Sequence, residues 1–317
     1  MRFIQGLRLV LMVACLLPVH AEPAVIDITS FPLMLPDAPR ATEVTVHMTP
    51  TSQPKPVIVF SHGLGGSPHH FRSLSHAWAA AGFVVVLVRH SGSDDTLWFD
   101  KPRWRWPRHF RLAASENELR WRVNDIVATL HQLSVWQDDE HSRLYGQLDL
   151  ANIGIAGHSF GALTAQVMTG QGTGYDKAAY SDSRFKAALL LSPHYVKRGH
   201  RENSYTQVDR PWLIMTGSED DVPLFGTQAH ERLRLFPLLQ GEHFELVLDG
   251  AHHFSFSDFT PSHHTLKRRL AHHQNAIEKI SVQYWHAYLS HSPAAKQRLR
   301  SESVREWLKG SDRWQWK

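Results

Sequence analysis

The sequence predicts an α/β fold in which a mostly parallel central sheet is flanked by helices. Short apolar runs alternate with helical patterns along the chain, and the runs are apolar throughout rather than at every second position. A strand that is apolar along its whole length is covered on both faces, as in a parallel sheet between two layers of helices. The alternation of strands with helices is typical of the same architecture.

Each run and each pattern predicts one element. We expect strands at 24–28, 43–48, 56–60, 83–88, 153–156, 187–191, 212–215 and 244–248. We expect helices at roughly 69–81, 116–134, 160–170, 226–235 and 273–290. No repeat, low-complexity tract or proline- and serine-rich linker divides the chain, so we expect a single domain over residues 22–317.

The first 21 residues have the pattern of a secretory signal peptide. Two arginines precede an apolar stretch at 9–17, and residues 19–21 fit a small-x-small cleavage site. The stretch is too short to cross a bilayer. We therefore expect an exported protein, periplasmic or secreted; the alternative is a lipoprotein anchored at Cys15.

The charge, cysteine and histidine content limits which partners and which site chemistries we expect. The formal charge is +4, from 34 basic and 30 acidic residues, so it indicates no strongly charged partner. Cys15 is the only cysteine, and its removal with the signal would leave no thiol nucleophile, disulfide or thiolate metal site. The 23 histidines include the pairs 69–70, 252–253, 263–264 and 272–273. They lack a metal-ligand spacing such as HExxH, so we interpret them as solvated or helix-face histidines and expect no metal and no cofactor.

The motif GHSFG, residues 157–161, suggests a nucleophile. It follows an apolar run rich in β-branched residues and precedes a helical pattern. This strand–turn–helix context predicts a nucleophile elbow, which exposes the hydroxyl of Ser159 to a substrate. Without that context, the motif would be a glycine-bounded turn with an incidental serine.

A serine nucleophile needs a base to take its proton and an acid to orient the base. Glu219, Asp220 and Asp221 follow one predicted strand, and His252 and His253 follow the next. The order serine, acid, histidine is the one that this elbow requires. Spacing alone leaves the choice among the neighbours open.

Attack on an ester carbonyl produces an oxyanion, which backbone N–H groups must stabilise. The residue after the nucleophile, Phe160, supplies one donor. The loop FSHGLGG, which follows the first core strand, is expected to supply the other, and we assign it to Leu64.

Four motifs together resemble a known family. VIVFSHGLGGS, GHSFGA, GSEDDVP and GAHHFSFSD look like the platelet-activating-factor acetylhydrolase and predicted dienelactone hydrolase branch of the α/β-hydrolases, over most of residues 55–260. The resemblance implies an α/β-hydrolase fold, a metal-free serine hydrolase mechanism and ester substrates. It assigns the catalytic positions to Ser159, Asp220 and His253, and the oxyanion positions to Leu64 and Phe160.

The resemblance also selects between neighbouring residues. Related loops place the acid three residues after a glycine, which selects Asp220 over Asp221. The pattern Gly-x-x-His-x-x-Phe-x-Asp is met from Gly250 to Asp258, which selects His253 over His252 as the base.

A segment rich in tryptophan and arginine, near 94–115, departs from the pattern of the fold. Nucleic-acid binding is improbable for an exported protein, although such segments can bind single strands. We interpret the segment as an insertion that rims the active-site mouth or contacts a lipid surface through Trp98, Trp104 and Trp106, or that packs only.

Three functions fit these features. The leading hypothesis is an exported serine hydrolase of carboxylic esters that works through an acyl-enzyme, with short-chain or phospholipid-like acyl esters as substrates. The alternative is a hydrolase of polyesters or emulsified lipids. The third is a non-catalytic binding protein on a hydrolase scaffold. The oligomeric state is open.

Overall fold

The computed structural model describes residues 25–34, 41–172, 179–196, 203–259 and 270–317. The predicted signal peptide and Cys15 lie outside the described residues. Within the described residues, no helix combines the length and the apolar character needed to cross a bilayer.

Nine strands of the described residues form one mixed sheet in the order β1-β2-β4-β3-β5-β6-β7-β8-β9. The strands from β4 to β8 pair in parallel, whereas β1, β2 and β9 add antiparallel pairs at the two edges. The strands are β1 (Ile26–Met34), β2 (Ala41–Met48), β3 (Lys55–Ser61), β4 (Val84–Arg89), β5 (Leu148–His158), β6 (Phe185–Leu191), β7 (Trp212–Glu219), β8 (His243–His252) and β9 (Arg313–Trp316). This is the α/β-hydrolase fold, and the predicted fold class is confirmed.

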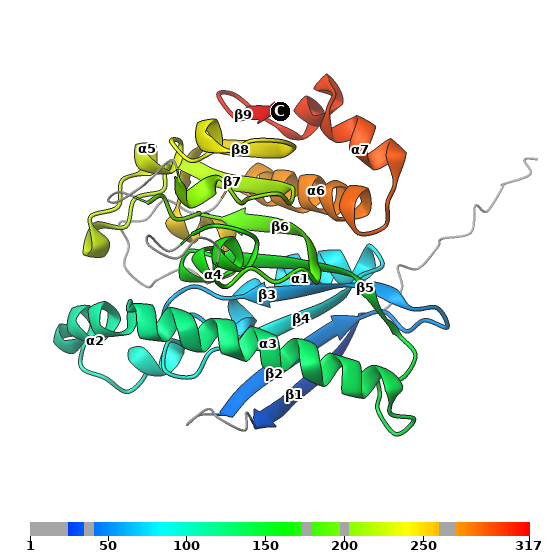
Figure 1. Cartoon of the computed structure of the whole chain (residues 1–317). Coiled ribbons are helices and arrows are strands. Elements are labelled where there is room, and N and C mark those ends of the chain that lie inside the picture. The colour runs from blue at the N-terminus through cyan, green and yellow to red at the C-terminus, as the bar shows by residue number, and fades with distance from the viewer. Residues whose placement is uncertain (1–24, 35–40, 173–178, 197–202, 260–269) are drawn as a thin grey trace, which may run out of the picture.

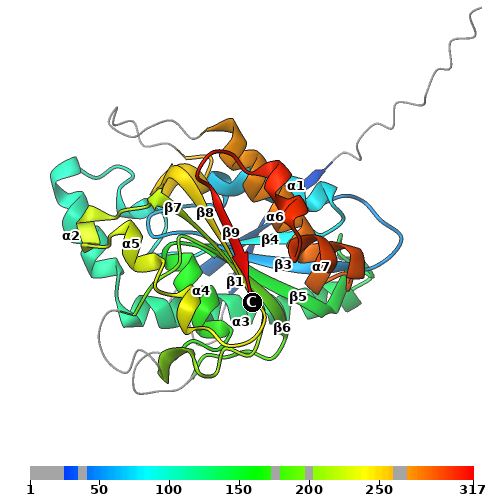
Figure 2. The same ribbon diagram turned by 90° about the horizontal axis from the view of Figure 1, so that it is seen from above.

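Helices cover both faces of the sheet, which accounts for the continuous apolar strands (Figures 1 and 2). One core lies between the sheet and α3 and α4, and the other lies between the sheet and α1 and α6. The helices are α1 (Arg72–Ala80), α2 (Trp106–Ala113), α3 (Glu116–Asp138), α4 (Phe160–Met168), α5 (Ala229–Arg232), α6 (Ala271–Tyr288) and α7 (Pro293–Leu299).

The N-terminus of α3 shows how the sequence positions a helix. The Ser115 hydroxyl accepts a hydrogen bond from the Glu118 N–H at 3.2 Å, and acidic side chains occupy the first turn. Both features stabilise the unpaired N–H groups and the positive end of the helix dipole. The helix therefore begins at Glu116, and its buried face includes Leu119, Arg122 and Ile126.

The structure differs from the predicted elements at a few places. The helix expected at 226–235 is only the short α5, because Gly226 has a left-handed φ of 61° and Pro237 starts a new 3₁₀ turn soon after. The helices α2 and α7 and the edge strand β9 are additional. Each is at most eight residues long, too short for a reliable periodic signal.

Candidate active site

Ser159 lies at a sharp turn between β5 and α4. Its backbone has φ 55° and ψ −114°, a combination that residues with a side chain rarely adopt. The turn requires both flanking glycines, because a Cβ on Gly161 would lie 1.9 Å from the carbonyl oxygen of Ser61, and a Cβ on Gly157 2.2 Å from that of Gly161. This geometry is that of a nucleophile elbow.

The loops that follow β7 and β8 bring an acid and a histidine into contact. The two strands pair in parallel, so both loops leave the same edge of the sheet. His253 Nδ1 lies 2.7 Å from Asp220 Oδ1. Because a carboxylate only accepts hydrogen bonds, Nδ1 carries the proton and Nε2 keeps the lone pair that a general base needs.

Asp220 is fully buried, and its surroundings keep it ionised. Burial alone would raise its pKa, but the positive charge of Arg232 and the hydrogen bond from His253 lower the pKa to about 2. Arg232 Nε lies 3.3 Å from Asp220 Oδ2, and the Thr216 hydroxyl donates to the same oxygen at 2.8 Å. The carboxylate can therefore orient His253 and stabilise its protonated form.

The two neighbouring residues make other contacts. Asp221 is exposed, and its Oδ1 accepts a hydrogen bond from the Ala229 N–H at the start of α5, at 2.7 Å. His252 Nδ1 accepts a hydrogen bond from the Phe254 N–H at 3.2 Å. The structure thus pairs Asp220 with His253, and it gives Asp221 and His252 roles at the starts of short helices.

His158 supports the backbone of the histidine loop. Its Nε2 donates to the carbonyl oxygen of His253 at 2.9 Å, and the two imidazole rings lie 4.7 Å apart. Burial, reinforced by the nearby His253, lowers the pKa of His158 to about 3. The ring is therefore neutral at pH 7 and acts as a fixed hydrogen-bond donor.

The two expected oxyanion donors come from segments that meet at Ser159. The loop after β3 approaches the elbow closely, because a Cβ on Gly63 would lie 3.4 Å from the Ser159 Cβ. Over the described residues, no acceptor is paired with the amide N–H of Leu64 or of Phe160. Both N–H groups are therefore available for the role that we expect of them.

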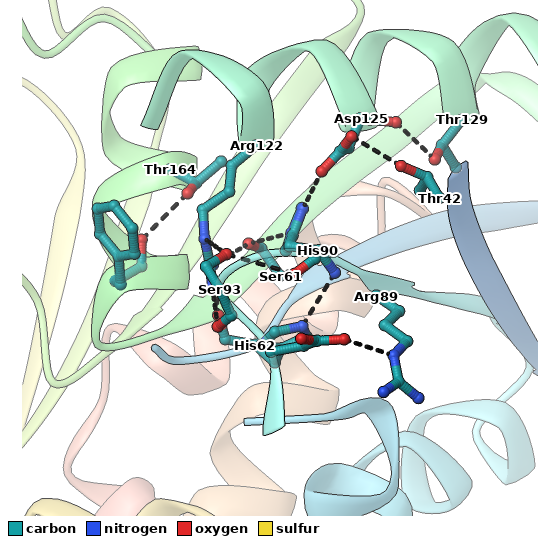
Figure 3. Close-up of polar contacts among 12 residues, drawn as sticks. Thr42, Ser61, His62, Arg89, His90, Ser93, Arg122, Asp125, Thr129 and Thr164 are labelled. Atoms are coloured by element: carbon teal, nitrogen blue, oxygen red, sulfur yellow. Dashed lines mark hydrogen bonds and ion pairs between the residues drawn. The ribbon is translucent and has the colours of Figure 1, made fainter. Parts of the chain in front are cut away.

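Arg122 contacts residues 62–66 after β3, which we call the oxyanion loop because it carries the expected donor Leu64, and the Arg122 side chain is fully buried. Figure 3 shows the guanidinium reaching from α3 to the segments of Ser61, His62 and Ser93. Arg122 donates to the His62 carbonyl oxygen at 2.6 Å and to the Ser93 hydroxyl at 2.8 Å. Its guanidinium carbon also lies 4.6 Å from the ring centre of Phe160. A single cation thus contacts both the loop after β3 and the ring of Phe160.

A second chain of serine, histidine and aspartate lies next to Arg122 (Figure 3). The Ser61 hydroxyl lies 2.8 Å from His90 Nε2, and His90 Nδ1 lies 2.8 Å from Asp125 Oδ2. All three residues are fully buried, and none lines the cavity at Ser159. This arrangement joins β3, β4 and α3 and has no access to a substrate.

A cavity of about 870 Å³ opens at Ser159 and His253. Segments that follow β3, β4, β5, β7 and β8 form the cavity, and this end of the sheet is where α/β proteins place their ligand sites. Aromatic and aliphatic side chains dominate its walls, and Leu224 and Phe225 contribute from the loop after β7. The cavity therefore suits a substrate with a large apolar part.

The segment rich in tryptophan and arginine forms one wall of this cavity. Trp98, Trp106 and Phe110 line it. The Trp98 indole N–H also donates to the Gly65 carbonyl oxygen at 2.7 Å, so the segment packs directly on the oxyanion loop. Trp104 does not line the cavity; its side chain is 75% exposed.

Sequence reasoning missed several residues around the site. Arg122 and Asp125 lie on the buried face of α3, where the periodicity predicts apolar side chains. A charge at such a position was the signal that could have marked them. Arg232 and His158 had no comparable signal, because their partners come from distant loops.

The fold and this site define an α/β-hydrolase with a serine elbow. The family model described as "Platelet-activating factor acetylhydrolase, isoform II" matches residues 33–100 and 127–283. The chain belongs to this family. The match omits 101–126, which contain α2 and Arg122.

Curated relatives agree with the family. The chain is 26% identical over 234 residues to the platelet-activating factor acetylhydrolase of Cavia porcellus, covering 66% of this chain and 50% of that protein. It is 24% identical over 240 residues to the protein of the same name from Bos taurus, with the same coverages. The chain spans about half the length of these relatives.

Proposed function

We propose that this protein hydrolyses carboxylic esters through an acyl-enzyme formed on Ser159. The observation that carries the proposal is the hydrogen bond between His253 and the buried Asp220, together with an apolar cavity that His253 lines beside a serine held in an elbow turn. Family membership supports the proposal, because relatives are named as hydrolases of an acetyl ester.

The geometry suggests the steps of the reaction. The Ser159 oxygen attacks the ester carbonyl carbon while its proton passes to His253 Nε2, and the N–H groups of Leu64 and Phe160 bind the oxyanion. Collapse of the intermediate breaks the ester C–O bond, and His253 returns the proton to the departing alcohol. Water then attacks the acyl-enzyme with the same base, which releases the acid and restores the serine.

Ser159→Ala tests the mechanism. The variant should fold normally, lose turnover of p-nitrophenyl esters and lose labelling by a fluorophosphonate probe, because only the hydroxyl is removed. Ser61→Ala is the control serine: it belongs to the buried chain of His90 and Asp125, so the labelled site in it should still be Ser159. Labelling of folded Ser159→Ala at another serine would contradict the assignment, and a folded wild type that is never labelled would favour a non-catalytic binding protein.

The substrate class that we propose is a short-chain or phospholipid-like acyl ester. The large apolar cavity supports this, since it can accept a lipid-like group beside a small acyl group. A panel of p-nitrophenyl esters of increasing chain length, together with an acetylated ether phospholipid, tests it. The highest kcat/KM on long acyl chains would favour a lipase-like enzyme.

Exposed apolar residues favour contact with a lipid or polyester surface as a second candidate. Phe99, Trp104 and Leu112 are 62%, 75% and 67% exposed, and arginines surround them in the same segment. Aromatic and basic side chains together suit an interface with lipid. Trp104→Ala should lower activity on emulsified esters and leave activity on p-nitrophenyl acetate unchanged. An equal loss relative to wild type on both substrates, or no loss on either, would exclude this surface role.

We further propose that the protein is exported through a signal peptide at 1–21, with anchoring at Cys15 as the alternative. The sequence pattern supports this. N-terminal sequencing of the exported protein distinguishes the two, because cleavage after Ala21 produces a start at Glu22, whereas a lipoprotein starts at a lipidated Cys15.

A further inference from the structure

Two histidines at the start of α6 meet an aspartate that precedes β9. Potential metal-ligating atoms of His272, His273 and Asp312 all lie within 4.8 Å of one another. His272 Nε2 is 3.6 Å from Asp312 Oδ2. In Figure 2 the red segment leading into β9 passes beside the orange start of α6. The cluster thus joins segments about 40 residues apart in the sequence.

The hydrogen bonds of His273 determine which ring nitrogen is free. Its Nε2 lies 3.0 Å from the Asp249 carbonyl oxygen, which can only accept, so Nε2 carries the proton. The lone pair is therefore on Nδ1, which belongs to a ring that is 1% exposed. Among the described residues, this nitrogen has no hydrogen-bond partner. A buried acceptor without a partner is unfavourable unless a ligand occupies the space that it faces.

The carboxylate is held in place as well. Asp312 Oδ1 accepts the Asp249 N–H at 2.8 Å, and Oδ2 accepts the Lys309 N–H at 2.9 Å. Hydrogen bonds that orient an imidazole and a carboxylate in this way are typical of the surroundings of bound metals. The backbone N–H and C=O groups of Asp249 thus orient the Asp312 carboxylate and the His273 ring.

We propose that His272 Nε2, His273 Nδ1 and Asp312 Oδ2 bind a divalent zinc ion. Two imidazoles and one carboxylate form a common zinc ligand set, with water in the fourth position. The 3.6 Å separation of His272 from Asp312 is close to the roughly 3.3 Å expected between two ligands of a tetrahedral zinc ion.

The site is separate from the proposed ester chemistry. None of its three ligands lines the cavity at Ser159. Zinc would tie α6 and the turn before β9 to Asp249, which lies in β8 four residues before His253. Its function is to stabilise the end of β8.

A second cluster, formed by Asp27, His47 and His76, provides a comparison. His76 Nε2 lies 2.9 Å from Asp27 Oδ1, and Arg72 binds Asp27 Oδ2 at 2.8 Å. The guanidinium already neutralises this carboxylate and would repel a metal ion, so this cluster fits zinc less well. His76→Gln is therefore a matched control.

The test uses the untagged protein, freed of metal by dialysis against a chelator and then equilibrated with zinc chloride. Bound zinc is measured by atomic absorption, and the melting temperature is measured with and without zinc. We expect wild type and His76→Gln to retain one zinc per chain and to melt a few degrees higher with zinc. His272→Gln should bind zinc on the order of 100-fold more weakly and show no shift in melting temperature.

The choice of His272 keeps the test interpretable, because its side chain is partly exposed and we expect its replacement to leave the fold intact. Asp312→Asn is a second variant that retains an acceptor for a backbone N–H and should also bind zinc more weakly. Cobalt(II) should produce the visible bands of a tetrahedral site in wild type and not in His272→Gln. Zinc retained equally by His272→Gln and wild type, or not retained by wild type, would overturn the proposal.

Discussion

Ser159 shows how one residue combines backbone strain with function. A φ of 55° is unfavourable for serine, and the close packing of Gly161 against the β3 loop maintains it. The strain places the serine on the cavity wall, beside His253. A side chain at position 161 would push Gly161 away from the Ser61 carbonyl oxygen. The elbow therefore depends on this glycine as much as on the serine.

The pairing of His253 with Asp220 predicts different effects for two adjacent aspartates. Asp220→Asn should lower kcat by about 10⁴-fold, because an amide donor at Oδ1 favours the wrong histidine tautomer. Asp221→Asn should retain most activity, since Asp221 lines the cavity but its carboxylate accepts from the Ala229 N–H and does not pair with His253. Steady-state kinetics on p-nitrophenyl acetate compares them, and a severe loss in Asp221→Asn alone would reverse the assignment.

The environment of His253 predicts the acid limb of the pH profile. Burial lowers its pKa, the Asp220 carboxylate raises it in part, and the net pKa lies below the ordinary 6.5. Because the neutral imidazole is the base, kcat/KM should fall with decreasing pH around a midpoint below 6.5. Initial rates between pH 4 and 8 on an ester without an ionisable group measure the midpoint. A midpoint above 6.5 would contradict this environment.

At the scale of elements, α3 supports the reaction without lining the cavity. Its Arg122 hydrogen-bonds the oxyanion loop and stacks on Phe160, so it positions both donors. Arg122→Lys keeps the charge but loses the planar fork that reaches several oxygens at once.

We predict that Arg122→Lys lowers kcat by roughly 10²-fold, comparable to the loss of one oxyanion donor, with little change in KM. The acid limb should not move, because the main charges that act on His253 are those of Asp220 and Arg232. Arg120→Lys, an exposed change on the same helix, is the control. A kcat equal to that of the control would show that Arg122 does not position the donors.

At the scale of the whole molecule, buried neutral histidines connect stability to pH. Burial lowers the pKa of His158 to about 3 and that of His47 to about 4, from 6.5. At pH values below 6.5 and above these lowered pKa values, the two histidines are protonated in the unfolded chain and neutral in the folded chain. Stability should therefore decrease as the pH falls, by up to about 1.4 kcal/mol per pH unit for each histidine.

Urea unfolding of the metal-free protein at pH 7.5 and 5.0 tests this prediction. The free energy of unfolding should be at least roughly 4 kcal/mol lower at pH 5.0, because His158 and His47 each contribute about 2 kcal/mol and burial also lowers the pKa of His62 well below its ordinary value. His47→Gln should reduce the loss by about 2 kcal/mol, since glutamine does not titrate. A free energy of unfolding that is unchanged or higher at pH 5.0 would contradict the prediction.

Much of the fold was predictable because it depends on local pattern. Continuous apolar runs specify strands covered on both faces, and the order of serine, acid and histidine along the chain follows the order of the strand ends. The short α2, α7 and β9 were not predictable, because their positions depend on surfaces provided by the rest of the fold.

The sequence by itself determined the α/β order, the elbow at Ser159 and the segments that carry the acid and the histidine, because local pattern and spacing specify them. Tertiary structure decided which residues meet: Asp220 contacts His253, Arg122 reaches the oxyanion loop, and Trp104 is not part of the cavity lining. These contacts join residues far apart in the chain, and only the packing of strands and helices sets such distances.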